Sequence, residues 1–108
     1  MTDKYINEEG LVGVIISPGF GAGFHTWNAI PGLCFDKDII QMILEDKSVQ
    51  ELVDFAETKY AYTGYVCTLG LAAAEIMWVK PGTQFFIDEY DGFESITPIE
   101  NNEDLLTA

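Results

Sequence analysis

Residues 36–60, DKDIIQMILEDKSVQELVDFAETKY, decide the fold class because they carry two helical patterns and a start signal for each. Asp36 is well placed to cap the first helix, and apolar residues then recur at helical spacing at Ile39, Ile40, Ile43 and Leu44. Ser48 and Glu51 have the spacing of a capping box, and one apolar stripe follows at Val49, Leu52, Val53, Ala56 and Tyr60. We therefore predict two consecutive amphipathic helices.

Strand patterns lie on both sides of this helical region. Residues 11–17, LVGVIIS, form a short, almost continuous apolar run, which predicts a strand buried on both faces. Residues 76–79 predict a second strand ahead of a turn, whereas residues 60–71 are assigned to a loop that could hold a short strand. Asp91-Gly92 between two β-prone arms is a strong hairpin signal. The expected fold is α+β, with two helices on one face of a mostly antiparallel sheet and a C-terminal hairpin.

The length and composition fit one domain. The chain has 108 residues, of which 48 % are hydrophobic, so we expect a single domain over residues 1–108 with mobile ends at 1–10 and 100–108. No apolar run is long enough for a membrane helix, and the polar start does not resemble a signal peptide, so we expect a cytoplasmic protein. Cys34 and Cys67 are then expected to be reduced, buried and inert.

The charge is strongly acidic and limits the choice of partners. Five Lys and no Arg stand against eighteen Asp and Glu, which gives a formal net charge of −13. Direct binding to DNA or RNA is not expected, because such binding needs basic groups that displace counterions from phosphates. Three interpretations stay open: a solvated acidic surface, a mimic of a nucleic acid that occupies a basic groove, and attraction to another cationic partner.

The glycine-rich segment SPGFGAGFHTWN, residues 17–28, is the candidate ligand site. Its glycines fit neither a phosphate-binding P-loop nor the dinucleotide fingerprint. They are compatible with a nest of backbone N–H groups that binds an anion beside stacking aromatic rings, or with a tight turn capped by core aromatics. The candidate ligand-binding residues are Gly19, Phe20, Gly21, Gly23, Phe24, His25, Thr26, Trp27 and Asn28, with Glu89 and Tyr90 from the hairpin.

No catalytic residue, metal site or cofactor is assigned. His25 is the single histidine, but nothing in the sequence fixes a nucleophile such as Ser17 or Cys34 beside it. The acidic hairpin does not have the spacing of a calcium loop, and its carboxylates are expected to be solvated: Asp88, Glu89, Asp91 and Glu94. One face of the hairpin could be covered by a second subunit of a homo-oligomer.

The chain resembles small uncharacterised proteins encoded by tailed bacteriophages and prophages. The resemblance spans most of the chain and rests on two segments, the glycine-aromatic segment (Gly19, Gly21, Gly23, Thr26, Trp27 and Asn28) and the EYDG-x-E segment (Glu89, Tyr90, Asp91, Gly92 and Glu94). It implies an accessory protein that acts against host machinery, either by sequestering a nucleotide immune signal or by binding a host protein.

Three functions follow from these observations. The favoured one is a non-enzymatic protein that binds a small ligand, for which a nucleotide-like molecule is the expected class. The alternatives are an acidic inhibitor or nucleic-acid mimic that binds a basic host protein, and a small hydrolase that uses His25.

Overall fold

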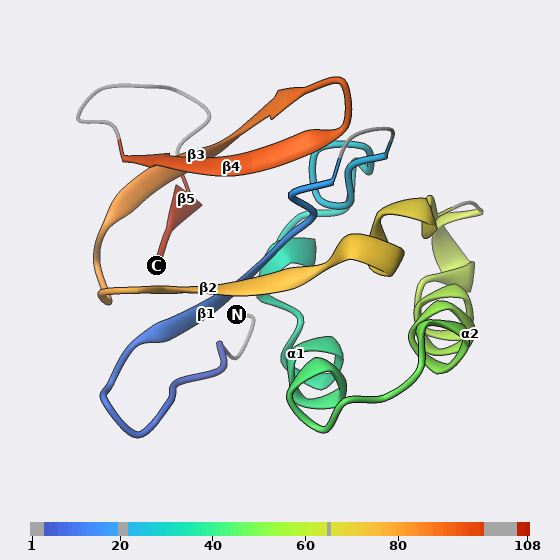
Figure 1. Cartoon of the computed structure of the whole chain (residues 1–108), viewed down its shortest axis with the longest axis horizontal. Coiled ribbons are helices and arrows are strands. Elements are labelled where there is room, and N and C mark those ends of the chain that lie inside the picture. The colour runs from blue at the N-terminus through green and yellow to red at the C-terminus, as the bar shows by residue number, and fades with distance from the viewer. Residues whose placement is uncertain (1–3, 20–21, 65, 99–105) are drawn as a thin grey trace.

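The computed structural model describes residues 4–19, 22–64, 66–98 and 106–108, and within them it shows two α-helices, short 3-10 turns and two small antiparallel sheets (Figure 1). The helices are α1 (Lys37–Leu44) and α2 (Val49–Lys59), and the 3-10 turns are η1 (Leu33–Phe35), η2 (Ala61–Thr63) and η3 (Leu69–Ala73). The strands are β1 (Val12–Ile16), β2 (Glu75–Val79), β3 (Gln84–Tyr90), β4 (Phe93–Pro98) and β5 (Leu106–Thr107). The α+β class is confirmed.

Both helices begin at the residues that the sequence indicates. The Asp36 carboxylate accepts a hydrogen bond from the Ile39 N–H at 2.9 Å and caps α1. The Ser48 hydroxyl accepts a hydrogen bond from the Glu51 N–H at 3.2 Å and caps α2. The same hydroxyl donates to the Glu51 carboxylate at 3.1 Å. Because these side chains satisfy N–H groups that the first helical turn leaves open, the helix starts are fixed locally.

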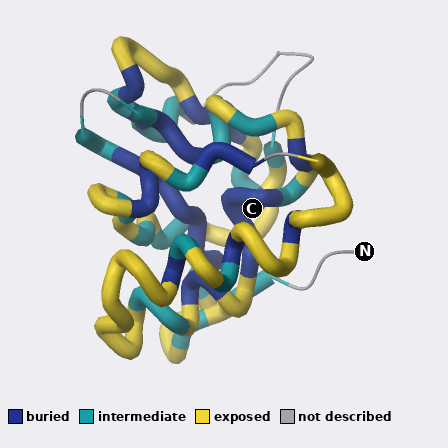
Figure 2. Tube along the Cα trace, turned by 90° about the vertical axis from the view of Figure 1, so that its right-hand side faces the viewer, coloured by how far each residue is buried: buried dark blue, intermediate teal, exposed yellow. Residues whose placement is uncertain are grey.

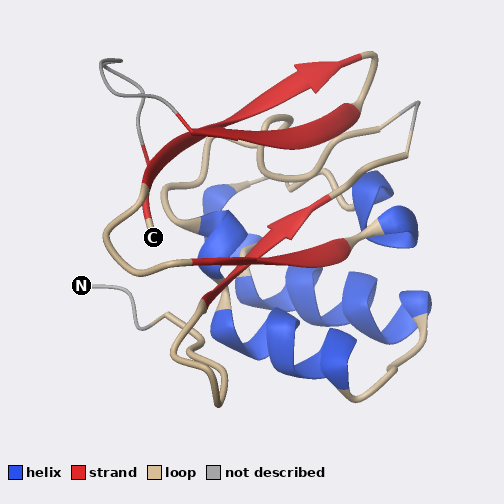
Figure 3. Cartoon of the chain, turned by 60° about the vertical axis from the view of Figure 1, so that its left-hand side comes forward, coloured by secondary structure: helices blue, strands red, loops and turns tan. Residues whose placement is uncertain are grey.

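The strands form two sheets rather than one. β1 pairs with β2, and β3 pairs with β4 on one side and β5 on the other, all antiparallel. The helices lie against the β1–β2 sheet, and the β3–β4 hairpin lies on its other side (Figure 3). The hairpin turn is as predicted: Asp91 and Gly92 have φ angles of 52° and 86°, the left-handed values that a tight two-residue turn requires.

The last residues of the chain pair into the second sheet, whereas the acidic sequence of residues 100–108 predicts a mobile tail. β5 pairs with the start of β3, and the Ala108 N–H donates to the Thr83 carbonyl at 2.9 Å. Ala108 is buried. Near the other end, Ile6 forms a β-bridge with Val12. The rest of the predicted mobile tail, residues 100–105, lies outside the described residues.

β1 runs through the middle of the core and contributes residues to two apolar clusters. Figure 2 shows that the buried stretches of the chain lie in the interior of the molecule. Ile15 packs with the helices, whereas Val12, Val14 and Ile16 pack with the β3 sheet. Every residue of β1 is buried, so the prediction of a strand covered on both faces is confirmed. A Cβ on Gly13 would lie 3.2 Å from the ring of Trp78, its partner on β2, and 3.3 Å from Ile40 of α1, so the helix packs closely on the sheet at this glycine.

The segment between the helices and β2 contains no strand in its described residues. η2 and η3 take the place of the short strand that residues 60–71 could have formed. Cys34 and Cys67 are free and buried, as expected. No helix in the described ranges is long and apolar enough to cross a membrane.

Candidate functional site

A buried carboxylate holds the glycine-rich segment in place. Glu94 of β4 is 0 % exposed, and its two carboxylate oxygens accept four hydrogen bonds. Oε1 accepts the Ser17 N–H at 2.9 Å, while Oε2 accepts the Phe24 N–H at 2.9 Å, the Thr26 N–H at 2.8 Å and the Thr26 hydroxyl at 2.6 Å. The Glu94 N–H in turn donates to the Ser17 carbonyl at 2.8 Å. The expectation that Glu94 is solvated is therefore wrong.

These contacts bear on whether the glycine-rich segment is an anion-binding nest or a tight turn. Backbone N–H groups do converge on an anion, as a nest would, but the anion is the chain's own carboxylate. A Cβ on Gly23 would lie 2.7 Å from the Thr26 hydroxyl and 2.8 Å from the Trp27 ring. A Cβ on Gly70 would lie 2.5 Å from the Gly23 carbonyl oxygen. Gly23 and Gly70 are thus required by close packing around Glu94.

The other residues of the predicted loop site are divided between core and surface. Phe24 is fully buried in the core and closed to a ligand, whereas Trp27 is 41 % exposed. Asn28 is engaged with the backbone: its side-chain amide donates to the Phe24 and Cys67 carbonyls at 2.8 and 3.0 Å and accepts the Cys67 N–H at 2.7 Å. Phe20 and Gly21 lie outside the described residues. Among the described residues of this segment, Trp27 is the exposed large hydrophobic side chain.

The two hairpin residues of the predicted site lie near the tip. Glu89 accepts the Gly92 N–H at 2.5 Å and so stabilises the turn. Tyr90 is 77 % exposed. Glu94 lies on the partner strand β4 and is buried. The hairpin therefore places the Glu94 carboxylate in the interior and the Tyr90 ring in solvent.

His25 and Cys34 are neighbours, and their contact does not activate either one. The His25 Nδ1 accepts the Cys34 N–H at 3.2 Å, which leaves any ring proton on Nε2. Burial lowers the pKa of His25, although the Glu94 charge partly opposes this. Burial also raises the pKa of the Cys34 thiol to about 12, so the sulfur is a neutral thiol and a poor nucleophile.

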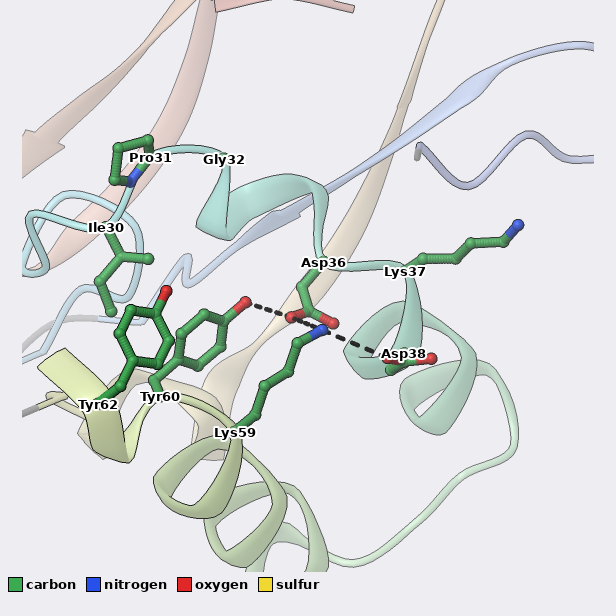
Figure 4. Close-up of a pocket in the computed structure, with 9 residues that line it drawn as sticks. All are labelled: Ile30, Pro31, Gly32, Asp36, Lys37, Asp38, Lys59, Tyr60 and Tyr62. Atoms are coloured by element: carbon green, nitrogen blue, oxygen red, sulfur yellow. Dashed lines mark hydrogen bonds and ion pairs between the residues drawn. The ribbon is translucent and has the colours of Figure 1, made fainter. Parts of the chain in front are cut away.

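A cavity of about 600 Å³ lies away from the glycine-rich segment, at the end of α2 and the start of α1 (Figure 4). We call it the tyrosine pocket. Three stretches of chain line it: Ile30, Pro31 and Gly32; Asp36, Lys37 and Asp38; and Lys59, Tyr60 and Tyr62. None of these residues is predicted to contact a ligand from the sequence, because the local pattern marks Asp36 as a helix cap and Tyr60 as a core position.

A polar network forms the floor of the tyrosine pocket. The Asp36 carboxylate is buried, and besides capping α1 it accepts a short hydrogen bond from the Tyr60 hydroxyl. The Lys59 ammonium lies 2.9 Å from Asp36 Oδ2 and 3.3 Å from Asp38 Oδ2. Asp36 thus has three donors, the Ile39 N–H, the Tyr60 hydroxyl and the Lys59 ammonium, and together they hold the carboxylate in place.

The network raises the pKa values of Lys59 and Tyr60. Desolvation by itself lowers the pKa of Lys59, but hydrogen bonds and attraction from Asp36 and Asp38 outweigh it and raise that pKa. Burial and the hydrogen bond to Asp36 both raise the pKa of Tyr60. Lys59 is consequently a cation and Tyr60 a neutral phenol near neutral pH.

The rim of the tyrosine pocket is aromatic. The Tyr60 and Tyr62 rings lie with centroids 6.3 Å apart and planes at 43°, and Tyr62 is 79 % exposed. Figure 4 shows both rings beside Ile30 and Pro31, while the Lys37 side chain extends away from the other lining residues. A smaller cavity, of about 280 Å³, lies next to Tyr60 and is lined also by Glu57, Ala61, Gly64 and Val66.

Comparison with known proteins identifies no relative of this chain. No family model matches the chain, and neither the curated proteins nor the solved structures contain a match. Among residues 4–19, 22–64, 66–98 and 106–108, no group of three His, Cys, Asp or Glu side chains could hold a metal ion.

Proposed function

We propose that this chain is a non-enzymatic protein that binds a small molecule in the tyrosine pocket. The observation that carries the proposal is a cavity of about 600 Å³ with a rigid polar floor, formed by Asp36, Lys59 and Tyr60, beneath the exposed ring of Tyr62. Small-molecule sites commonly have volumes of roughly 300–1,000 Å³, an apolar or aromatic lining and a few fixed polar groups.

The chemistry of the lining favours binding over catalysis. A general base needs a free lone pair, and a nucleophile needs a group that loses its proton readily. The Asp36 carboxylate is shared among three donors, Lys59 is held as a cation, and Tyr60 is held as a phenol. These groups are suited to positioning a ligand.

The biological setting stays a prediction. The resemblance to bacteriophage proteins suggests that the ligand is a signal which the protein sequesters, and a nucleotide-like molecule is one class to test. The acidic inhibitor remains the competing hypothesis, since the net charge of −13 would suit a basic protein partner.

The test compares two exposed aromatic residues at the two candidate sites. Purified protein is screened by thermal shift against nucleotides, cyclic nucleotides, ADP-ribose derivatives and ring-bearing amines and carboxylates, because a ligand of the native state raises the melting temperature. The same screen is run on Tyr62→Ala and on Trp27→Ala; these rings are 79 % and 41 % exposed, and neither belongs to the two core clusters.

We expect at least one compound to stabilise the wild type and Trp27→Ala but not Tyr62→Ala. Loss of the shift in Trp27→Ala alone would move the site to the glycine-rich segment and contradict the assignment to the tyrosine pocket. If no compound changes the melting temperature, small-molecule binding is contradicted. The acidic inhibitor would then be sought as a salt-sensitive complex with a basic protein.

A further inference from the structure

We infer that the tyrosine pocket selects an organic cation that carries a flat apolar ring. This inference rests on the proposed function and specifies its ligand class. It differs from the nucleotide-like class that the resemblance to bacteriophage proteins implies, and three features of the site favour it.

The first feature is the charge that converges on the cavity. Two carboxylates, Asp36 and Asp38, face one ammonium, that of Lys59, at 2.9 and 3.3 Å. The second lysine of the lining, Lys37, extends away from them in Figure 4. The converging side chains therefore carry a net negative charge, and the rest of the chain, with its net charge of −13, strengthens that field.

The second feature is that aromatic rings beside the cavity already bind a cation, the Lys59 ammonium. The Lys59 ammonium lies 5.7 Å from the centroid of the Tyr60 ring and 5.7 Å from that of Phe55, both within the range of cation–π attraction. The neighbouring Tyr62 ring is 79 % exposed and borders the same cavity. Tyr62 and Asp38 both line this cavity and both are exposed, so the proposed ligand stacks its ring on Tyr62 and directs its cationic group toward the carboxylates of the lining.

The third feature is that the groups which would attract an anion are occupied. The N–H of Ile39 at the start of α1 is bound to the Asp36 carboxylate, so that helix end does not offer this donor to a phosphate. The Lys59 ammonium is shared between two carboxylates. In the glycine-rich segment, the Phe24 and Thr26 N–H groups are bound to Glu94. An anion in the tyrosine pocket would have to compete with carboxylates already in place.

The experiment uses three probes with the same ring and different charge: 2-phenylethylammonium, 2-phenylethanol and 3-phenylpropanoate. Each is titrated into the full ¹⁵N-labelled chain at neutral pH and low salt, and binding is followed by amide chemical shifts at Ile30, Gly32, residues 36–38 and residues 59–62. A molecule of this size binds with a dissociation constant of about 1 mM, so the titration extends to about 10 mM.

We expect the ammonium to shift these resonances and to bind about fivefold more tightly than the carboxylate, with the alcohol between them. Asp38→Asn should remove most of this preference, because it deletes a carboxylate of the lining and frees the Lys59 ammonium from one partner. Asp54→Asn is the matched control: Asp54 is an exposed carboxylate of α2 outside the pocket lining, and its removal should leave the preference unchanged.

The inference and the proposed function fail in distinguishable ways. If the carboxylate binds as tightly as the ammonium or more tightly, or if a nucleotide binds in a manner that depends on Tyr62, the cation selectivity is wrong while small-molecule binding stands. If the ammonium causes no shift up to about 10 mM, the inference is overturned; if the broad compound screen is also silent, the proposed function falls with it.

Discussion

Replacement of Glu94 by Gln tests whether the buried carboxylate is the anchor of the glycine-rich segment. The variant keeps the size of the side chain but removes its charge and turns one acceptor oxygen into an NH₂ donor. Oε2 accepts three hydrogen bonds and Oε1 accepts one, from Ser17. The amide is therefore expected to keep its oxygen toward Phe24 and Thr26 and to place its NH₂ against the Ser17 N–H.

The magnitude follows from these four contacts. Three hydrogen bonds change from a charged to a neutral acceptor and weaken by about 0.5–1 kcal/mol each, and one buried N–H loses its partner at a cost of about 1–3 kcal/mol. Relief from burying a charge offsets part of this loss. We expect the free energy of unfolding to fall by about 3 kcal/mol, which corresponds to a decrease in melting temperature of about 12 °C for a domain of this size.

The assay is urea unfolding of Glu94→Gln beside Glu75→Gln, which makes the same chemical change at an exposed glutamate of β2. Glu75→Gln should be neutral or slightly stabilising, since it reduces the self-repulsion of a chain with a net charge of −13. Equal stability of the two variants would refute the assignment of Glu94 as the anchor.

Two further predictions concern residues beside this anchor. Because burial lowers the pKa of His25, the unfolded chain takes up a proton as the pH falls through about 6.5 while the folded chain resists it, so stability should decline on acidification. Urea unfolding between about pH 8 and pH 5 should show this decline relative to His25→Asn, and parallel pH profiles would contradict it. Gly70→Ala should destabilise the domain by about 3 kcal/mol, because the new Cβ would lie 2.5 Å from a backbone oxygen. Gly10→Ala, at a position where φ is 81° but the surrounding space is open, should lower the free energy of unfolding by only about 1 kcal/mol. Thermal melts in which Gly70→Ala is the more stable of the two variants would contradict the predicted clash.

The sequence by itself determined the local elements of this protein. Caps, turns and apolar periods act between residues a few positions apart, so Asp36, Ser48 and the Asp91-Gly92 turn could be recognised without a structure. The burial of β1 on both faces was readable for the same reason, since a continuous apolar run has no solvated side.

Only the tertiary structure decided what these elements bring together. Glu94 and Ser17 are 77 positions apart, and nothing local distinguishes a glutamate that caps a distant loop from one that faces water. The sequence predicts Asp36 as a helix cap and Tyr60 as a core residue, and both predictions are confirmed. The chain reversal between α1 and α2 also brings these two residues, 24 positions apart, into one hydrogen bond at the floor of a pocket, which the sequence does not predict. The physical reason is that burial and hydrogen bonding depend on which surfaces meet, and that is set by the packing of the whole chain.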